Sequence, residues 1–268
     1  MKIHPLFLCL TLLPGLGHGQ ESAPQAVPSA AEPPAEETVL LVGADAALKP
    51  ALRELAQHWA DLHPEIKIEL ELANAATLER LIGEGRPYDV VLLSGLPAAD
   101  QLAEAGHLAP GQRKLVARDR LAVLGSATVG ELTSANWSSA LTGAWSRVAI
   151  GDATLTASGR LLAPVWAGLS LPEEGGPEVH AVPMDAQALE LLDGDRVDAV
   201  VGWRSLLGHH RGAGQVLVDL PGKGHAAHFY VAVQSQKAEH PKDAQAFMDF
   251  LVTAEAGEIW KKWDLAGK

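Results

Sequence analysis

Short apolar runs alternate with stretches of helical periodicity from Val39 onward, and this alternation limits the chain to a few folds. Residues 39–42 form an apolar run typical of a buried strand, and residues 48–62 place Leu48, Leu52, Leu55 and Trp59 on one helical stripe. Strands that alternate with helices in this way predict βαβ units and a largely parallel α/β sheet.

The same reading continues along the chain and predicts two series of such units. Further strands are expected at residues 66–72, 89–93, 121–124, 147–150, 179–182, 197–202 and 229–233, and further helices at 77–82, 97–105, 160–169, 186–192 and, as one or two helices, 241–263. Gly106 is expected to end its helix in a left-handed cap. Two series and a closing strand and helix predict two lobes, between which the chain crosses more than once. The cleft between such lobes is a natural ligand site.

The N-terminus has the layout of a secretory signal. Met1-Lys2 precedes an apolar stretch at residues 3–16 that is too short to span a bilayer, and Gly19 marks the expected cleavage point. The only cysteine, Cys9, lies in this segment, so the mature chain is expected to have no disulfide. Cys9 lies too early for lipid attachment. Residues 21–37, rich in Pro, Ala and Glu, are predicted to be a disordered tether.

Charge and motifs exclude several function classes. The chain has 268 residues with 21 Lys+Arg and 33 Asp+Glu, a formal net charge of −12, and no basic cluster of the kind that nucleic-acid binding requires. The nucleophile elbow, the zinc-protease motif and the phosphate loop are all absent from the sequence. The carboxylates of Asp100 and Glu104 share a helix face, which is typical of solvated acids. The chain is therefore not expected to be an enzyme.

Several segments, in their order and spacing, resemble the molybdate-binding periplasmic proteins of ABC importers. The segments are 52–56 (LRELA), 85–94 (GRPYDVVLLS), 102–108 (LAEAGHL), 110–114 (PGQRK), 119–121 (DRL), 148–152 (VAIGD), 157–160 (ASGR), 188–203, 246–251 (AFMDFL), 254–256 (AEA) and 259–260 (IW). The resemblance covers nearly everything from Val39 to the C-terminus.

This resemblance implies a two-lobed, clamshell-like α/β protein of the periplasm that delivers a small oxyanion, molybdate or tungstate, to an ABC permease in the inner membrane. The lobes are expected to be discontinuous. Residues 1–19 would be the signal peptide, 20–37 the linker, 38–118 lobe I, 119–228 lobe II and 229–268 a return to lobe I. A monomer without a cofactor is expected. Family members hold the dianion with hydroxyl groups and backbone N–H groups at helix N-termini, which carry partial positive charge.

Matching the family's ligand positions one by one gives a set of candidate site residues. The two ligand serines fall on Ala47 and Ala75, the small residue after the Gly-Asp strand on Ser158, the apolar residue at the head of a later helix on Asp185, and the tyrosine on Trp203. Two hydroxyl donors are thus replaced, and a lost hydrogen bond to a charged group is worth about 1.5–3 kcal/mol. Replacement donors are available in Asn74, Thr77, Thr154 and Thr156.

Asp185 creates the main conflict in this reading, because an ionised carboxylate repels a dianion. Either its side chain points away, for example as the N-cap of the following helix, or the natural ligand is not molybdate. The second possibility leaves the same clamshell with another small anion or a polar solute, or with a sensor or interaction role.

More ordinary roles are also open for these residues. Trp203 suits core packing, Asp45 a turn, and Arg160 a solvated or salt-bridged helix position. A metal site built from His209, His210, His225 and His228 matches no strong spacing, so loop histidines on a wet surface are expected instead.

Overall fold

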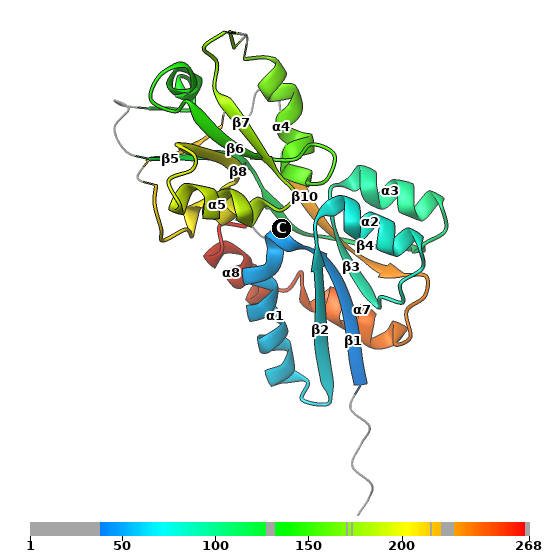
Figure 1. Ribbon diagram of the computed structural model, residues 1–268. Coiled ribbons are helices and arrows are strands. Elements are labelled where there is room, and N and C mark those ends of the chain that lie inside the picture. Colours follow the sequence, from blue (N-terminus) through cyan, green and yellow to red (C-terminus); the bar gives the residue numbers. More distant parts are fainter. Residues whose placement is uncertain are drawn as a thin grey trace, which may run out of the picture. The chain divides into compact units, whose positions relative to one another are not determined.

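The computed structural model describes residues 38–126, 132–169, 171–172, 174–214, 216–220 and 228–265. The predicted signal segment and tether lie outside these residues. The described chain forms two five-stranded mixed sheets, each with its own helices (Figure 1). None of the described helices combines the length and apolar character needed to cross a bilayer.

The first sheet has the strand order β2-β1-β3-β10-β4. Its strands are β1 (Thr38–Asp45), β2 (Ile66–Ala73), β3 (Val90–Ser94), β4 (Leu108–Asp119) and β10 (His228–Ser235). β1 pairs in parallel with β2 and β3, whereas β10 runs antiparallel to β3 and β4. Its helical segments are η1 (Ala46–Leu48), α1 (Lys49–Leu62), α2 (Ala75–Gly83), α3 (Leu96–Glu104), α7 (Pro241–Phe250) and α8 (Ala254–Lys262).

The second sheet has the order β7-β6-β8-β5-β9. Its strands are β5 (Leu121–Gly125), β6 (Arg147–Gly151), β7 (Glu178–Val182), β8 (Ala199–Trp203) and β9 (Val216–Asp219). β6 is parallel to β7 and β8, and β5 is antiparallel to β8 and β9. Its helical segments are η2 (Trp137–Thr142), α4 (Ala157–Ala167), α5 (Asp185–Asp193) and α6 (Arg204–Gly208). We call each sheet with its helices a lobe.

Every strand and helix predicted from the sequence is present, with ends displaced by a few residues. Gly106 ends its helix with φ +79°, as the sequence predicts. α4 starts before the expected position because the Thr156 side chain caps it, accepting a hydrogen bond from the Gly159 N–H at 3.0 Å. The long strand β4, the short strand β9 and the short helices α6 and η2 were not predicted.

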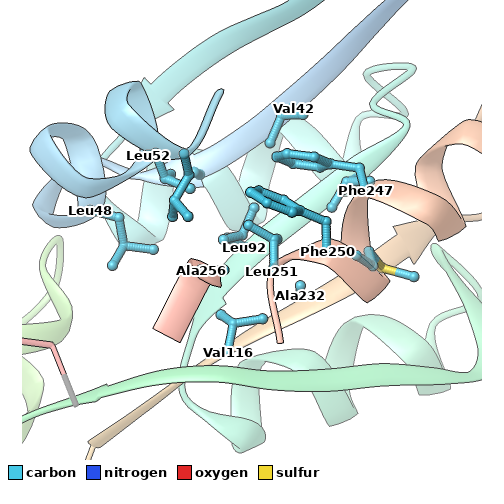
Figure 2. Packing of buried hydrophobic residues seen from close by; sticks show 14 of the residues in the cluster. Val42, Leu48, Leu52, Leu92, Val116, Ala232, Phe247, Phe250, Leu251 and Ala256 are labelled. Carbon is cyan, nitrogen blue, oxygen red and sulfur yellow. The ribbon is translucent and has the colours of Figure 1, made fainter. Parts of the chain in front are cut away.

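Apolar side chains on both faces of the first sheet hold its helices. One core cluster joins the sheet to α1, α7 and α8, and a second joins its other face to α2 and α3. Figure 2 shows Phe247 and Phe250 of the C-terminal region packed over Val42 and Leu92 of the central strands. The last helices therefore complete the first lobe, although the strands and helices of the second lobe precede them in the sequence.

The chain passes between the lobes where the two sheets adjoin. β4 ends at Asp119 and β5 begins at Leu121, so only Arg120 separates strands of different sheets. His228, at the start of β10, lies opposite Asp119 in the antiparallel ladder. The outgoing strand and the returning strand therefore lie side by side at this point.

The packing of the returning helices predicts the effect of truncating Phe247. Its ring is fully buried and meets Trp59 of α1 edge to face, with ring centroids 5.4 Å apart. Phe247→Ala should lower the free energy of unfolding by about 3–5 kcal/mol. Leu62→Ala, at a position 53% exposed, should change it by about 0.5 kcal/mol or less. Equal effects of the two variants in urea denaturation would contradict this packing.

Candidate functional site

A small cavity lies where the first residues of several helical segments meet between the lobes. It has a volume of about 30 Å³. Its lining consists of Asp45, Ala46, Ala47, Asn74, Ala75, Thr156, Met184, Asp185, Ala186 and Leu206. A space of this size holds one or two water-sized groups, or a compact ion, and nothing much larger.

The strand-to-helix turns explain why helix starts gather here. η1 follows β1, α2 follows β2 and α5 follows β7 with short turns, and α4 follows β6 after a few residues. In open α/β sheets, ligands bind outside the carboxyl ends of the strands, where helix N-termini present unsatisfied N–H groups. The small cavity therefore has the position expected for an anion site.

Side chains of the protein already accept hydrogen bonds from some of the N–H groups at these helix starts. The Asp45 Oδ1 atom accepts from the Ala47 N–H at 2.9 Å, and Asn74 Oδ1 accepts from the Thr77 N–H at 2.8 Å. Thr156 caps α4 in the same way. The start of α5, by contrast, has no side-chain cap. Its first N–H groups are the donors that these caps leave for a ligand.

Asp185 faces this cavity rather than turning away from it. It is the first residue of α5, not its N-cap, and its carboxylate accepts a hydrogen bond from the Ser158 hydroxyl. The expectation that Asp185 caps the helix is therefore wrong: Met184 holds the cap position, and the Asp185 side chain contacts α4 of the same lobe. Burial raises the pKa of Asp185 to about 7; Ser158 opposes this shift, while the charges of Asp45 and Asp119 add to it.

Asp45 is a second carboxyl group of the cavity. Besides capping η1, as a turn former would, it accepts a hydrogen bond from the Ser94 hydroxyl at 2.5 Å. Its side chain is buried, and burial raises its pKa above the ordinary value. No Lys or Arg is among the described residues that line the cavity. The two carboxyl groups thus share a poorly hydrated space, which favours their protonated forms.

A third buried carboxyl group, Asp119, lies at the connection between the lobes. Its Oδ2 atom accepts from the Ser205 hydroxyl at 2.5 Å, and its Oδ1 atom accepts from the Arg120 N–H at 2.8 Å. Burial outweighs these hydrogen bonds and raises its pKa to about 6. Asp119 does not line the small cavity, but its charge reaches Asp185.

Hydroxyl groups and one glycine complete the site. The Thr156 and Ser158 hydroxyl oxygens are 3.2 Å apart, and the Thr156 hydroxyl also donates to the Asp152 carbonyl at 3.0 Å. A Cβ atom at Gly151 would collide with both hydroxyl groups and would lie 2.8 Å from Asp185 Oδ1. Only glycine therefore lets β6 pass this close to the cluster.

The structure brings together most of the residues matched from the sequence. Ala47, Ala75 and Asp185 line the small cavity, and Ser158 joins it through its hydrogen bond to Asp185. Trp203 lies outside the lining and is fully buried. Its indole Nε1 lowers the pKa of Asp185, although no hydrogen bond of ordinary geometry forms at that atom.

The replacement donors are mostly committed to the fold. Asn74 uses its Nδ2 group to donate to the Pro183 carbonyl of the other lobe at 3.0 Å, and Thr154 donates to Asp152. Arg160 forms an ion pair with Glu79 across the lobes, so the salt-bridged role predicted for it is confirmed. Polar contacts of Asn74 and Arg160 therefore link the lobes around the cavity.

The histidines do not behave as one group. Both ring nitrogens of His209 contact backbone carbonyls, and His210 contacts Asp193 at 2.9 Å. His228 is packed against Trp203, so the expectation of a wet surface position is wrong for it. His225 lies outside the described residues. Within the described ranges, no three His, Cys, Asp or Glu side chains form a cluster that could hold a metal ion.

Several residues of the site were missed in the sequence. Ser94 is the last residue of β3 and Asp119 is the last residue of β4, so each lies at the carboxyl end of a strand. Their partners are 49 residues away for the Ser94–Asp45 pair and 86 for the Ser205–Asp119 pair. Only the position at a strand end could have marked them.

Two lobes with helix starts around a small interlobe cavity define a solute-binding protein. The chain belongs to the bacterial extracellular solute-binding protein family, whose model matches residues 40–264. Proteins of this family act in transport, and its bacterial members work outside the cytoplasmic membrane. A search of curated proteins found no match.

Solved structures agree with this fold at low sequence identity. The Azotobacter vinelandii periplasmic molybdate-binding protein has a TM-score of 0.74 and 17% identity, covering 85% of this chain and 99% of that one. The substrate-binding domain of a putative molybdenum ABC transporter from Clostridium difficile has a TM-score of 0.66 and 17% sequence identity, and the match covers 86% of this chain and 99% of that one. A sulfate-binding protein from Mycobacterium tuberculosis has a TM-score of 0.71 and 15% sequence identity, and the match covers 86% of this chain and 87% of that one.

The raised pKa of Asp185 predicts how stability varies with pH. Its folded-state pKa of about 7 lies above the ordinary 3.8, so the folded chain holds this proton more tightly and loses stability as pH rises from about 4 to 7. Asp185→Asn removes the penalty. It should raise the free energy of unfolding by about 2–4 kcal/mol at pH 8 and by little at pH 4.

Asp198→Asn is the matched control in the same lobe. The Asp198 carboxylate pairs with Arg147, and its pKa is lowered rather than raised. That variant should therefore be less stable than the wild type at pH 8, with a difference that shrinks below about pH 4. Chemical denaturation at both pH values measures these differences. A constant effect of Asp185→Asn across the pH range would contradict the placement of its carboxyl group.

Proposed function

We propose that this chain is the periplasmic solute-binding subunit of an ABC importer and captures a single small oxyanion, molybdate or tungstate, in the small cavity. The observation that carries the proposal is the meeting of helix N-termini around a space of about 30 Å³ that no Lys or Arg among the described residues lines. Such termini bind anions through N–H groups and dipoles. The similarity to molybdate-binding proteins supports this choice of ligand. In this proposal the chain acts as a monomer and passes its ligand to a permease in the inner membrane.

Asp185 makes this capture dependent on protons. When ionised, its carboxylate repels a dianion; when protonated, it stops repelling and can donate a hydrogen bond. A dianion in the cavity would raise the Asp185 pKa above its value of about 7. The oxyanion therefore binds together with a proton, and its affinity falls by up to about tenfold for each pH unit above 7.

A second candidate function is the capture of another small polar solute in the same cavity, and the carboxyl groups favour it. Ala47 and Ala75 provide no hydroxyl donors, whereas Asp45 and Asp185 provide acceptors when ionised. A solute that brings its own N–H or O–H donors would use these acceptors and would bind more tightly above pH 7. A sensor or interaction role would keep the same ligand chemistry and need no permease.

Binding measured at two pH values tests the proposal and separates the candidates. Calorimetric titration with molybdate, tungstate, sulfate and phosphate at pH 6 and pH 8.5 should give the tightest binding with molybdate or tungstate at pH 6. A ligand at 100 times its dissociation constant should also stabilise the chain by about 2.7 kcal/mol. Failure of both ions to bind at pH 6 would sink the oxyanion proposal. Tighter binding of a donor-bearing solute at pH 8.5 would favour the second candidate.

Asp185→Asn isolates the role of the carboxyl group in this titration. Its amide cannot ionise and always offers donors, so tungstate affinity at pH 8.5 should rise by roughly tenfold to thirtyfold over the wild type. At pH 6 the two proteins should differ little. Asp198→Asn, remote from the cavity, should leave tungstate affinity unchanged at both pH values. An unchanged affinity of Asp185→Asn at pH 8.5 would exclude contact between this group and the ion.

A further inference from the structure

A second, much larger cavity opens between the lobes beside the small one. Its volume is about 570 Å³, within the range of pockets that hold small organic molecules. It extends from the end of β3 and the start of α3 in the first lobe to α4 in the second. Ser94 belongs to its lining and donates a hydrogen bond to Asp45, a residue of the small cavity. A wall of hydrogen-bonded side chains thus adjoins both spaces.

Apolar side chains from both lobes form much of this larger cavity. Leu96 and Pro97 come from the first turn of α3, Phe229 from β10 and Leu161 from α4. Leu96 is 37% exposed, which is uncommon for a large apolar side chain in this protein. A bare inorganic oxyanion gains nothing from such a wall, whereas a ligand with a hydrocarbon part buries it.

The polar groups of the larger cavity favour a negative charge. Arg160 is the one charged side chain among its described lining residues. Its two terminal nitrogens donate to Glu79 at 2.6 and 3.1 Å, which leaves three of the five guanidinium N–H groups without a hydrogen bond to the described part of the chain. α3 begins here with Gly95 at its cap position and no side-chain cap, and because Pro97 has no N–H, the Leu96 and Ala98 N–H groups are the donors that its first turn can offer.

His228 supplies an independent observation that points to a ligand in this cavity. It lines the cavity, and its Nε2 atom is buried without a hydrogen-bond partner among the described residues. Its ring contacts the rings of Trp203 and Tyr230, with centroid distances of 4.5 and 5.1 Å. Burial lowers its pKa to about 4, so the imidazole is neutral near pH 7. A buried polar atom without a partner is costly, and a ligand hydrogen bond would remove the cost.

We propose that this cavity binds a small organic acid, with its hydrocarbon part against Leu96 and Leu161 and its carboxylate at Arg160. His228 contributes a hydrogen bond to a polar group of the same ligand. The proposal deepens the proposed function, because it rests on the interlobe cleft of a solute-binding protein. It adds a ligand class that does not depend on the small cavity being an oxyanion site.

The competing role for Arg160 is purely structural: its ion pair with Glu79 links α4 of one lobe to α2 of the other. Two variants separate the roles. Glu79→Gln and Arg160→Gln both break this ion pair, but only Arg160→Gln removes the positive charge. If Arg160 binds the acid, Arg160→Gln must weaken acid binding, whereas Glu79→Gln must leave it unchanged or tighten it.

Calorimetric titration of the full chain with hexanoate, benzoate and hexylammonium at pH 7 tests the proposal, with tungstate at pH 6 as a separate arm. Hexanoate or benzoate should bind the wild type, and hexylammonium should not. Arg160→Gln should weaken acid binding about tenfold or more. Glu79→Gln should leave it unchanged or tighten it, because the guanidinium is released. Leu96→Trp should cover part of the apolar wall with a bulkier ring and so abolish or strongly weaken acid binding, while Leu62→Trp, on an exposed site of α1, should not.

The outcomes distinguish failure of this proposal from failure of the oxyanion proposal. No binding of hexanoate or benzoate by the wild type, or equal losses in Arg160→Gln and Glu79→Gln, would overturn the organic-acid site. Tungstate binding that is retained in Leu96→Trp, together with lost acid binding, would support two separate subsites. Acid binding without any tungstate binding would support the organic-acid site and would leave the oxyanion proposal refuted.

Discussion

The burial of carboxyl groups without a basic partner is the constraint on which the site depends. Asp45 and Asp185 lie at the ends of elements from different lobes, in a cavity whose described lining includes no Lys or Arg. Hydroxyl donors from Ser94 and Ser158 replace the missing cations. Such donors compensate a buried negative charge only in part. The folded form is therefore more stable when these carboxyl groups are protonated, and the pKa values of Asp45 and Asp185 rise.

This constraint connects the fold to ligand choice. Neutral donors alone suit a site that must both bind and release an anion, because no counter-ion holds the guest. The carboxyl groups add a condition on the ligand that we propose: it must bind together with a proton or carry its own hydrogen-bond donors. The larger cavity differs in having Arg160, an open helix N-terminus and apolar walls. The two spaces therefore favour different ligands, although Ser94 lies in the wall of one and contacts a residue of the other.

Local pattern was sufficient for most of the fold. β1 and α1 follow from an apolar run and a clear helical stripe, and Gly106 ends α3 as a left-handed cap. β4 was missed because Pro110, Gly111 and the adjacent Arg113 and Lys114 interrupt its pattern. Its strand form comes from long-range pairing with β10, which is more than a hundred residues away in the sequence. Pairing partners of this kind leave no local mark.

The site was predictable only in part, for the same reason. Position-by-position matching located Ala47, Ala75 and Asp185 at the cavity, because they follow recognisable strand-to-helix turns. The direction of the Asp185 side chain could not be inferred, since a helix-capping role and a hydrogen bond to Ser158 of another element are equally compatible with the local sequence. Trp203 fits the ordinary expectation of a buried packing residue rather than that of a lining residue.

The number of protons taken up with the ion tests the central claim most directly. Titration of the wild-type chain with tungstate at pH 7.5, in two buffers of different ionisation enthalpy, measures this number. We expect an uptake of roughly half to three quarters of a proton per ion, because Asp185, with a pKa of about 7, is about three quarters ionised at pH 7.5 and becomes neutral when the ion binds. Binding without proton uptake, or with proton release, would contradict it.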